Sequence, residues 1–172
     1  ATLDEANEGS TDNAYGQAIG TLTPAKSDWG GINVQAGGNA IIDHAVIRYG
    51  GQTGFTEMYS MLEVKDGGSL GVTNSLLEHS GSYGIYVNRA DTAVVTNPEI
   101  RNNEINDCMY PIYIRANGGF TGEYRITNNS GTGNTRNYIR LENKLVGSVK
   151  LGNSNALDWV FENDVLVSPG SK

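Results

Sequence analysis

The sequence is poor in cysteine, histidine and long apolar runs. Cys108 is the single cysteine among 172 residues, which excludes an internal disulfide and metal sites built on paired cysteines. The two histidines, His44 and His79, are too few and too far apart for paired-histidine ligation. No apolar run approaches the roughly 20 residues of a membrane span, and no signal peptide opens the chain. We therefore expect a soluble segment, whose leader, if it had one, has been removed.

Charge is also scarce, and its balance excludes one class of partner. Only 18% of residues are charged, and 19 acidic against 12 basic residues give a formal net charge of -7. No cluster of Lys and Arg is present that could follow a phosphate backbone. We do not expect nucleic acid as a partner.

The residues that are abundant favour strands and turns. The chain has 23 glycines and many Asn, Ser and Thr, which supply turns, while Val, Ile, Thr and Tyr supply strands. Its length fits one domain with a core that needs no disulfide or metal. The composition predicts an all-β protein.

A short phrase recurs along the chain, in which an aromatic residue or Met precedes alternating apolar positions. The copies begin at Trp29, Met61, Tyr83, Tyr110, Tyr138 and Trp159. Their last apolar positions are Val34, Val64, Val87, Ile114, Leu141 and Phe161, at intervals of 30, 23, 27, 27 and 20 residues. Such an irregular period is typical of solenoid coils with loops of variable length.

A second phrase follows each first one after a turn rich in Gly or Asn. Its copies begin at Ile41, Val72, Ile100, Tyr124 and Val149. Two strand signals per repeat, always in the same order and sense, stack like on like and form parallel strands. We therefore predict a right-handed parallel β-helix solenoid of about six coils.

One polar column is expected from this stacking. His44, Asn74, Asn102, Asn128 and Asn153 precede the apolar anchors of the second phrase at similar intervals. Amide side chains in register can pass hydrogen bonds from coil to coil and satisfy buried turn groups. We interpret this column as a structural ladder, in which His44 replaces one amide.

The phrases Asp28-Trp-Gly-Gly-Ile32, Asp43-His-Ala-Val-Ile-Arg-Tyr-Gly-Gly51 and Gly81-Ser-Tyr-Gly-Ile-Tyr-Val87 support a family resemblance. The pattern resembles the right-handed parallel β-helix proteins of the pectate lyase-like superfamily, including repeat segments of secreted multidomain bacterial-type proteins. The resemblance covers about residues 29–167. It implies a fold, and it carries function only weakly.

The chain divides into a non-repeating start and a repeating body. Residues 1–28 are predicted to form a polar leading loop and the lead-in to the solenoid, and residues 29–172 to form its coils, which we expect to continue beyond this segment. Asp4, Glu5, Glu8, Asp12 and Asp28 concentrate oxygen donors near the start. Calcium is the one cofactor that this composition leaves open, although no EF-hand spacing is present and a metal-free loop is the simpler interpretation.

The neighbours of the inward apolar residues must point outward in two adjacent columns. The first column is Asn33, Glu63, Tyr86, Tyr113 and Arg140, and the second is Gln35, Lys65, Asn88, Arg115 and Glu142. Aromatic faces with Asn, Arg and Glu nearby are suited to sugars. We predict a glycan-binding stripe of Glu63, Tyr86, Asn88, Tyr113, Arg115 and Arg140; the alternative is a solvated face whose side-chain ladders keep the strands in register.

Catalytic patterns are weak. The Gly-His-Gly and Arg-Ile-Lys phrases of polygalacturonase-like hydrolases do not occur, and Glu63 and Glu142 are about three coils apart, too far to act as a pair. His79 beside Glu78 could serve as a general base, but a solvated turn is the simpler interpretation. We expect Cys108 to be a small buried group rather than a nucleophile. No catalytic or metal-ligating residue is assigned.

Two functions remain after this reasoning. The first is a non-catalytic extracellular or cell-surface module for adhesion, glycan binding, or end-to-end or lateral self-association. The alternative is a fragment of a carbohydrate-active enzyme, a polysaccharide lyase or glycoside hydrolase. A structure in which two carboxylates converge would favour the second.

Overall fold

The computed structural model describes residues 24–52, 60–89, 98–123, 125–151 and 156–167. Within these ranges the chain forms thirteen strands, and all of their pairings are parallel. The strands belong to three sheets that the chain visits in turn. The protein is therefore a parallel β-solenoid, as the sequence predicted.

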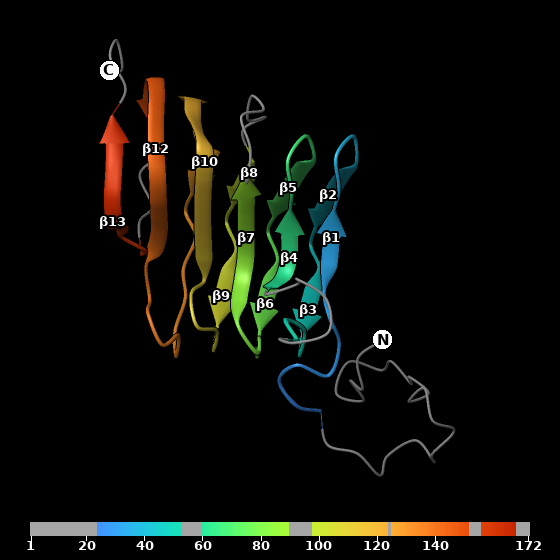
Figure 1. Ribbon diagram of the computed structural model, residues 1–172. Helices are drawn as coiled ribbons and strands as arrows, with labels where there is room; N and C mark the ends of the chain where they lie inside the picture. The colour runs from blue at the N-terminus through green and yellow to red at the C-terminus, as the bar shows by residue number, and fades with distance from the viewer. Residues whose placement is uncertain (1–23, 53–59, 90–97, 124, 152–155, 168–172) are drawn as a thin grey trace.

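The largest sheet has six strands and forms one long face of the solenoid (Figure 1). In spatial order they are β1 (Ile32–Val34), β4 (Ser60–Val64), β7 (Tyr83–Arg89), β10 (Ile112–Glu123), β12 (Ile139–Lys150) and β13 (Trp159–Val167). We name this sheet the first sheet.

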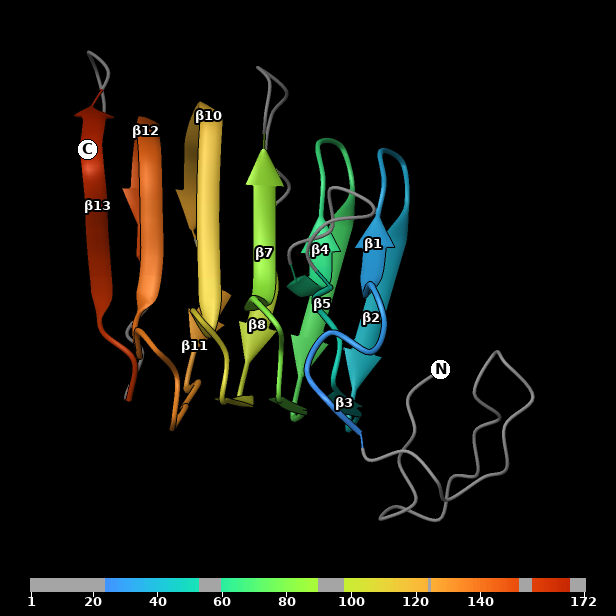
Figure 2. The same cartoon turned by 60° about the horizontal axis from the view of Figure 1, so that its bottom comes forward.

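The other two sheets complete the wall of the solenoid (Figure 2). The second sheet contains β2 (Asn39–Asp43), β5 (Ser69–Thr73), β8 (Glu99–Arg101) and β11 (Arg125–Thr127). The third contains β3 (Val46–Arg48), β6 (Leu76–Glu78) and β9 (Glu104–Asn106).

The core is a set of apolar columns that run through the stack. Val34, Val64, Val87, Ile114 and Leu141 are all buried and pair in one register across the first sheet, as predicted. Phe161 continues this column on the edge strand β13, where it is half exposed. The second and third sheets add the buried columns Val72, Ile100, Ile126 and Ile47, Leu77, Ile105.

The predicted coil count and the strands per coil were wrong. The described residues form three complete turns of three strands, not six coils of two strands. The second phrases at Ile41, Val72 and Ile100 are each divided by a turn into one strand of the second sheet and one of the third, whereas the phrase at Tyr124 contributes only β11 to the described strands. The phrase at Val149 starts no new strand, because it belongs to β12. The count of six came from first-sheet strands, and β12 and β13 have no described partners in the other two sheets.

Left-handed residues mark the two turns around the third sheet. Between the second and third sheets lie His44, Asn74, Asn102 and Asn128, with φ of 53°, 51°, 57° and 57°. After the third sheet lie Tyr49, His79, Asp107 and Gly133, with φ of 62°, 60°, 51° and 67°. Asn and Asp tolerate this conformation better than most residues, which explains why they recur at these positions.

The predicted amide ladder exists, but it is not the buried one. Asn102 Nδ2 donates to Asn74 Oδ1 at 3.2 Å and Asn128 Nδ2 to Asn102 Oδ1 at 3.2 Å, yet all three side chains are exposed. His44 does not join this ladder, because Asn74 donates to Asp43 Oδ1 instead, at 2.8 Å. Asn153 lies outside the described residues.

A second ladder, one residue further along the chain, is buried. Asn103 Nδ2 donates to Asn129 Oδ1 at 3.0 Å and to the Val72 carbonyl at 2.9 Å. Its Oδ1 accepts from the Ser75 amide at 3.0 Å. These side chains, not the predicted ones, satisfy the buried turn groups.

Candidate functional site

The predicted stripe lies on the outer face of the first sheet. The strand register aligns Asn33, Glu63, Tyr86, Tyr113 and Arg140 in one column. It aligns Asn88, Arg115 and Glu142 in the next. All six residues of the proposed glycan site are thereby brought together on one face.

This face is more deeply covered than a solvated sheet would be. Tyr86 and Tyr113 are only 4% and 6% exposed, and Glu63 is 1% exposed. The rings of Tyr86 and Tyr113 stack with centroids 4.8 Å apart and an interplanar angle of 14°, as their adjacent positions predict. The Tyr83 ring meets the Tyr113 ring edge-on at a centroid distance of 5.0 Å, and the Tyr110 ring lies tilted against it at 5.9 Å. The result is a compact tyrosine cluster, separate from the main core.

Arg140 organises one end of the tyrosine cluster. Its guanidinium carbon lies 4.4 Å from the Tyr113 ring centroid and 5.1 Å from that of Tyr110. It also pairs with two carboxylates, that of Glu142 on the same strand at 2.8 Å and that of Glu162 on β13 at 3.1 Å. This arrangement places one cation, held against aromatic faces, between two half-buried acids.

Tyrosine hydroxyls complete this centre. Tyr113 Oη donates to Glu142 at 2.5 Å, and Tyr110 Oη to Glu162 at 3.2 Å. Tyr138 also donates to Glu162, and Arg136 donates to the same carboxylate at 2.9 Å. Two carboxylates therefore do converge, as an enzyme of this kind would require.

The protonation states of these groups are poorly matched to catalysis. Burial raises the pKa of Tyr113, Tyr86 and Tyr110, so none of these phenols readily becomes a base. Burial alone would raise the pKa of Glu162, but the Tyr138 hydrogen bond and the Arg140 charge outweigh it and lower that pKa. A general acid needs the opposite shift.

Two stripe residues and the neighbouring Asn33 carry side-chain atoms without a hydrogen-bond partner in the protein. Asn88 Nδ2 donates to Glu63 Oε1 at 3.0 Å, but Asn88 Oδ1 has no partner. Asn33 Oδ1 and Arg115 Nε are likewise shielded from solvent and unbonded. Because most buried polar atoms in proteins are hydrogen-bonded, these three atoms need an explanation.

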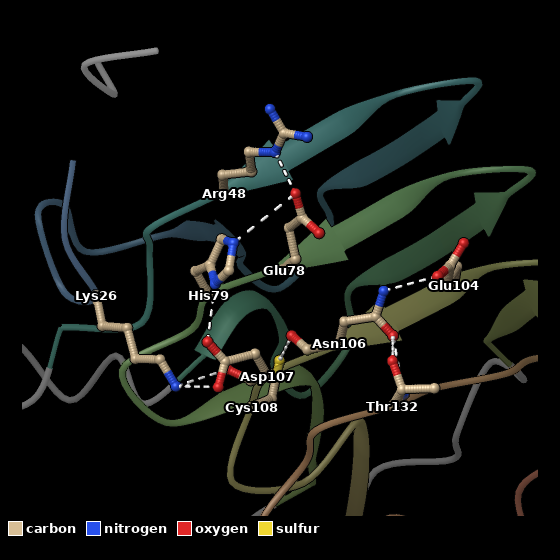
Figure 3. A network of polar contacts seen from close by, with 9 residues as sticks. All are labelled: Lys26, Arg48, Glu78, His79, Glu104, Asn106, Asp107, Cys108 and Thr132. Carbon is tan, nitrogen blue, oxygen red and sulfur yellow. Dashed lines mark hydrogen bonds and ion pairs between the residues drawn. The ribbon is translucent and has the colours of Figure 1, made fainter. Parts of the chain in front are cut away.

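The second region of interest surrounds His79, at the turns after the third sheet (Figure 3). His79 Nδ1 lies 2.8 Å from Asp107 Oδ2, and Lys26 Nζ lies 2.6 Å from Asp107 Oδ1. The imidazole stacks on Tyr49 with a centroid distance of 5.2 Å, and its Nε2 is 3.9 Å from Glu78 Oε1. His79 thus links three successive turns.

A histidine paired with a carboxylate resembles a general-base arrangement, but the one thiol beside it is not available as a nucleophile. Cys108, the next residue after Asp107, is buried and donates to the Asn106 carbonyl at 3.1 Å (Figure 3). Burial raises the pKa of the Cys108 thiol to about 12, so it stays protonated. The geometry favours a structural role for this network.

The cofactor expectations rest mainly on residues outside the described ranges. Asp4, Glu5, Glu8 and Asp12 all lie there, and Asp28 accepts a hydrogen bond from the Ala25 amide at 2.8 Å. Among the described residues, no group of three or more His, Cys, Asp or Glu side chains is placed to hold a metal ion. The described part of the chain also contains no helix long and apolar enough to cross a membrane.

Sequence reasoning missed four residues that surround Arg140. Glu162 follows Phe161 as Glu142 follows Leu141, so extending the second column by one strand would have found it. Tyr110 and Tyr138 were noted only as starts of the repeated phrase, although their position just before a strand places them beside the outer face. Arg136 lies in a loop and had no periodic signal.

No protein-family model matches the sequence, and no curated protein or solved structure matches it significantly. The likeness to pectate lyase-like proteins is therefore supported only at the level of the parallel β-solenoid.

Proposed function

We propose that the chain is a non-catalytic, extracellular or cell-surface β-helix module that binds a glycan along the outer face of its first sheet. Its coils wind right-handed, as crossover connections between parallel strands nearly always do. The observation that carries the binding proposal is the strand register, which brings the six residues of the stripe together on one face of the first sheet.

The tyrosine cluster supplies rigidity to this site. Tyr86 and Tyr113 stack on each other and Arg140 lies over Tyr113, so these aromatic faces are already occupied. Binding would therefore depend on polar groups held in place by a fixed aromatic base, which lowers the entropy lost on association. An adhesive or self-associating role of the same module uses the same rigid face.

The test is a glycan-array screen of the whole chain, followed by titration of every hit against variants. Asn88→Ala and Arg115→Ala should each weaken binding about ten-fold, because each removes a direct polar contact. Arg125→Ala, on the exposed face of the second sheet, is the matched control and should leave affinity unchanged. A hit that neither stripe variant affects would place the site elsewhere, and silence across the array would favour self-association.

The buried Tyr86 and Tyr113 are less suitable targets. Replacing both with Ala removes two stacked rings from a packed cluster and would change stability together with binding.

The alternative, a carbohydrate-active enzyme, is favoured by the convergence of Glu142 and Glu162 on Arg140. It predicts release of reducing or unsaturated ends from a polymer, and loss of that release in Glu162→Gln. Such release from the wild type, absent in the variant, would replace the binding proposal.

A further inference from the structure

The segment that leads into β1 crosses three successive turns of the solenoid. We name residues 25–30 the entry strap. The Asp28 amide donates to the Tyr49 carbonyl at 2.9 Å, in the first turn, which contains β1 to β3. Lys26 Nζ donates to the Asp107 carbonyl at 2.9 Å, just after β9 in the third turn (Figure 3). Because the turns of a solenoid normally contact only their neighbours, one segment bonded to both the first and the third turn is unusual.

The entry strap also covers the second turn, which contains β4 to β6. A Cβ on Gly81, just after β6, would overlap Ser27 Oγ. A Cβ on Gly50, just after β3, would lie 3.1 Å from the Trp29 ring. Neither glycine has a positive φ, so the backbone conformation does not require glycine here. The strap occupies the space that a side chain would need at these corners.

Charge holds the far end of the entry strap. Lys26 Nζ lies 2.6 Å from Asp107 Oδ1, and Asp107 Oδ2 lies 2.8 Å from His79 Nδ1. The hydrogen bond from Lys26 is the main reason why the pKa of Asp107 is lowered. The Lys26 and Asp107 side chains are 45% and 41% exposed, so their pair contributes little by itself and is screened by salt. It can therefore open without unfolding a strand.

We propose that the entry strap is a conformational clamp that makes the first three turns open as one unit, with the pair of Lys26 and Asp107 as its releasable latch. While the latch is closed, the first and second turns cannot separate from the third without displacing the strap. The two partners are 81 residues apart in the sequence, so the latch closes only after all three turns have formed. This inference concerns the stability of the stack and does not depend on glycan binding.

Amide hydrogen exchange on the whole chain tests the clamp, because equivalent amides report one turn each. The amides of His44, Asn74 and Asn102 lie at the same corner of the first, second and third turns, and each donates to a carbonyl of the following turn. In the wild type at low salt, their protection factors should agree within about two-fold. Lys26→Gln should lower the protection factor of the His44 amide about three-fold relative to that of Asn102, because the first turn then opens alone.

Two comparisons separate the clamp from a general loss of stability. Arg125→Gln removes an exposed ion pair with Glu99 outside the strap, and it should leave the three protection factors equal. High salt should reproduce the Lys26→Gln pattern in the wild type. Unequal protection in the wild type at low salt, or equal protection in Lys26→Gln, overturns the clamp.

Gly81→Ala tests the clamp independently, through packing. The added Cβ overlaps Ser27 Oγ and should displace the strap, so the His44 amide should lose protection as it does in Lys26→Gln. Adding Ser27→Gly removes the overlapping side chain and suits the left-handed backbone at φ 70°. It should restore protection in part, since the Gly51 carbonyl oxygen stays 2.9 Å from the new Cβ. Protection that Ser27→Gly does not restore would show that the strap does not clamp the second turn.

Discussion

Asn103 and Asn129 lie inside the solenoid, where each side-chain amide bonds a backbone group of the preceding turn. Asn103 Nδ2 reaches the Val72 carbonyl and Asn129 Nδ2 the Ile100 carbonyl, both at 2.9 Å. The exposed Asn74, Asn102 and Asn128 bond one another and Asp43. The two adjacent asparagine columns therefore contribute differently to the free energy of unfolding, because a buried group left without its partner costs more than an exposed one.

Asn103→Ala should lower the free energy of unfolding by about 1–3 kcal/mol, because the Ser75 amide and the Val72 carbonyl would remain buried without a partner. Asn102→Gly, which preserves the left-handed backbone at φ 57°, should change it by less than about 0.5 kcal/mol. Urea denaturation measures both. Equal losses in the two variants would mean that the exposed column also carries stability.

Asp43 should make stability depend on pH in the acid range. Hydrogen bonds from Thr73, Asn74 and His44 lower its pKa to about 2 from the model-compound value of 3.8. A depressed folded-state pKa contributes stability that is present above pH 3.8 and is lost as pH falls toward 2. The stability difference between wild type and Asp43→Asn should shrink over this interval, and added salt should reduce it further. A difference independent of pH would show that the hydrogen bonds do not favour the charged form.

At the scale of the strands, the sequence predicted register better than it predicted connectivity. The alternation of apolar residues around Val64, Val87 and Ile114 marks these positions in the sequence. Aligning them predicted that they pair with one another across the first sheet. The strands of the third sheet could not be separated from the second phrase, because each has three residues and a single buried anchor, such as Leu77. The positions of the outward columns could be predicted as well, but not the burial of Glu63, since burial depends on what covers the face.

Two glycines in strands test the close packing between neighbouring turns. A Cβ on Gly84, in β7, would lie 2.5 Å from Ile105 Cγ2 and 2.6 Å from the Pro111 carbonyl oxygen. A Cβ on Gly71, in β5, would meet no atom within 4 Å.

Gly84→Ala should therefore destabilise by about 1–3 kcal/mol, because the next strand would have to move. Gly71→Ala should be neutral or stabilise by up to about 1 kcal/mol, since alanine loses less entropy than glycine in a strand. Thermal unfolding of the two variants checks the pair. A tolerated Gly84→Ala would mean that β7 and β10 are less tightly packed than described.

At the scale of the whole molecule, stability should vary along the stack, because each turn contacts only its neighbours. Trp29, which precedes β1, donates from its indole to the Arg48 carbonyl at 2.7 Å, and the first three turns are complete. Trp159 begins β13, which in the described structure pairs only with β12. The two tryptophans thus report opposite regions of the solenoid.

Trp29→Phe leaves Trp159 as the single indole, and Trp159→Phe leaves Trp29. The fluorescence transition reported by Trp159 should occur at lower urea concentration than the one reported by Trp29, because strands with fewer neighbours open first. Far-ultraviolet circular dichroism on both variants controls for global destabilisation by the substitutions. Coincident transitions would show that the whole stack unfolds as one unit.

The order in which the strands pair also determines how the chain can fold. Val34 pairs with Val64 and Val87 with Ile114, so a full turn of 30 or 27 residues must close before either parallel contact forms. Closing a loop of that length costs roughly 3 kcal/mol in chain entropy, and a single turn has no stacked neighbour to offset it. Nucleation therefore requires two turns at once and is slow, whereas each later turn finds a ready edge and adds rapidly. Growth of this kind can follow the direction of synthesis, since every new turn needs only the one made before it.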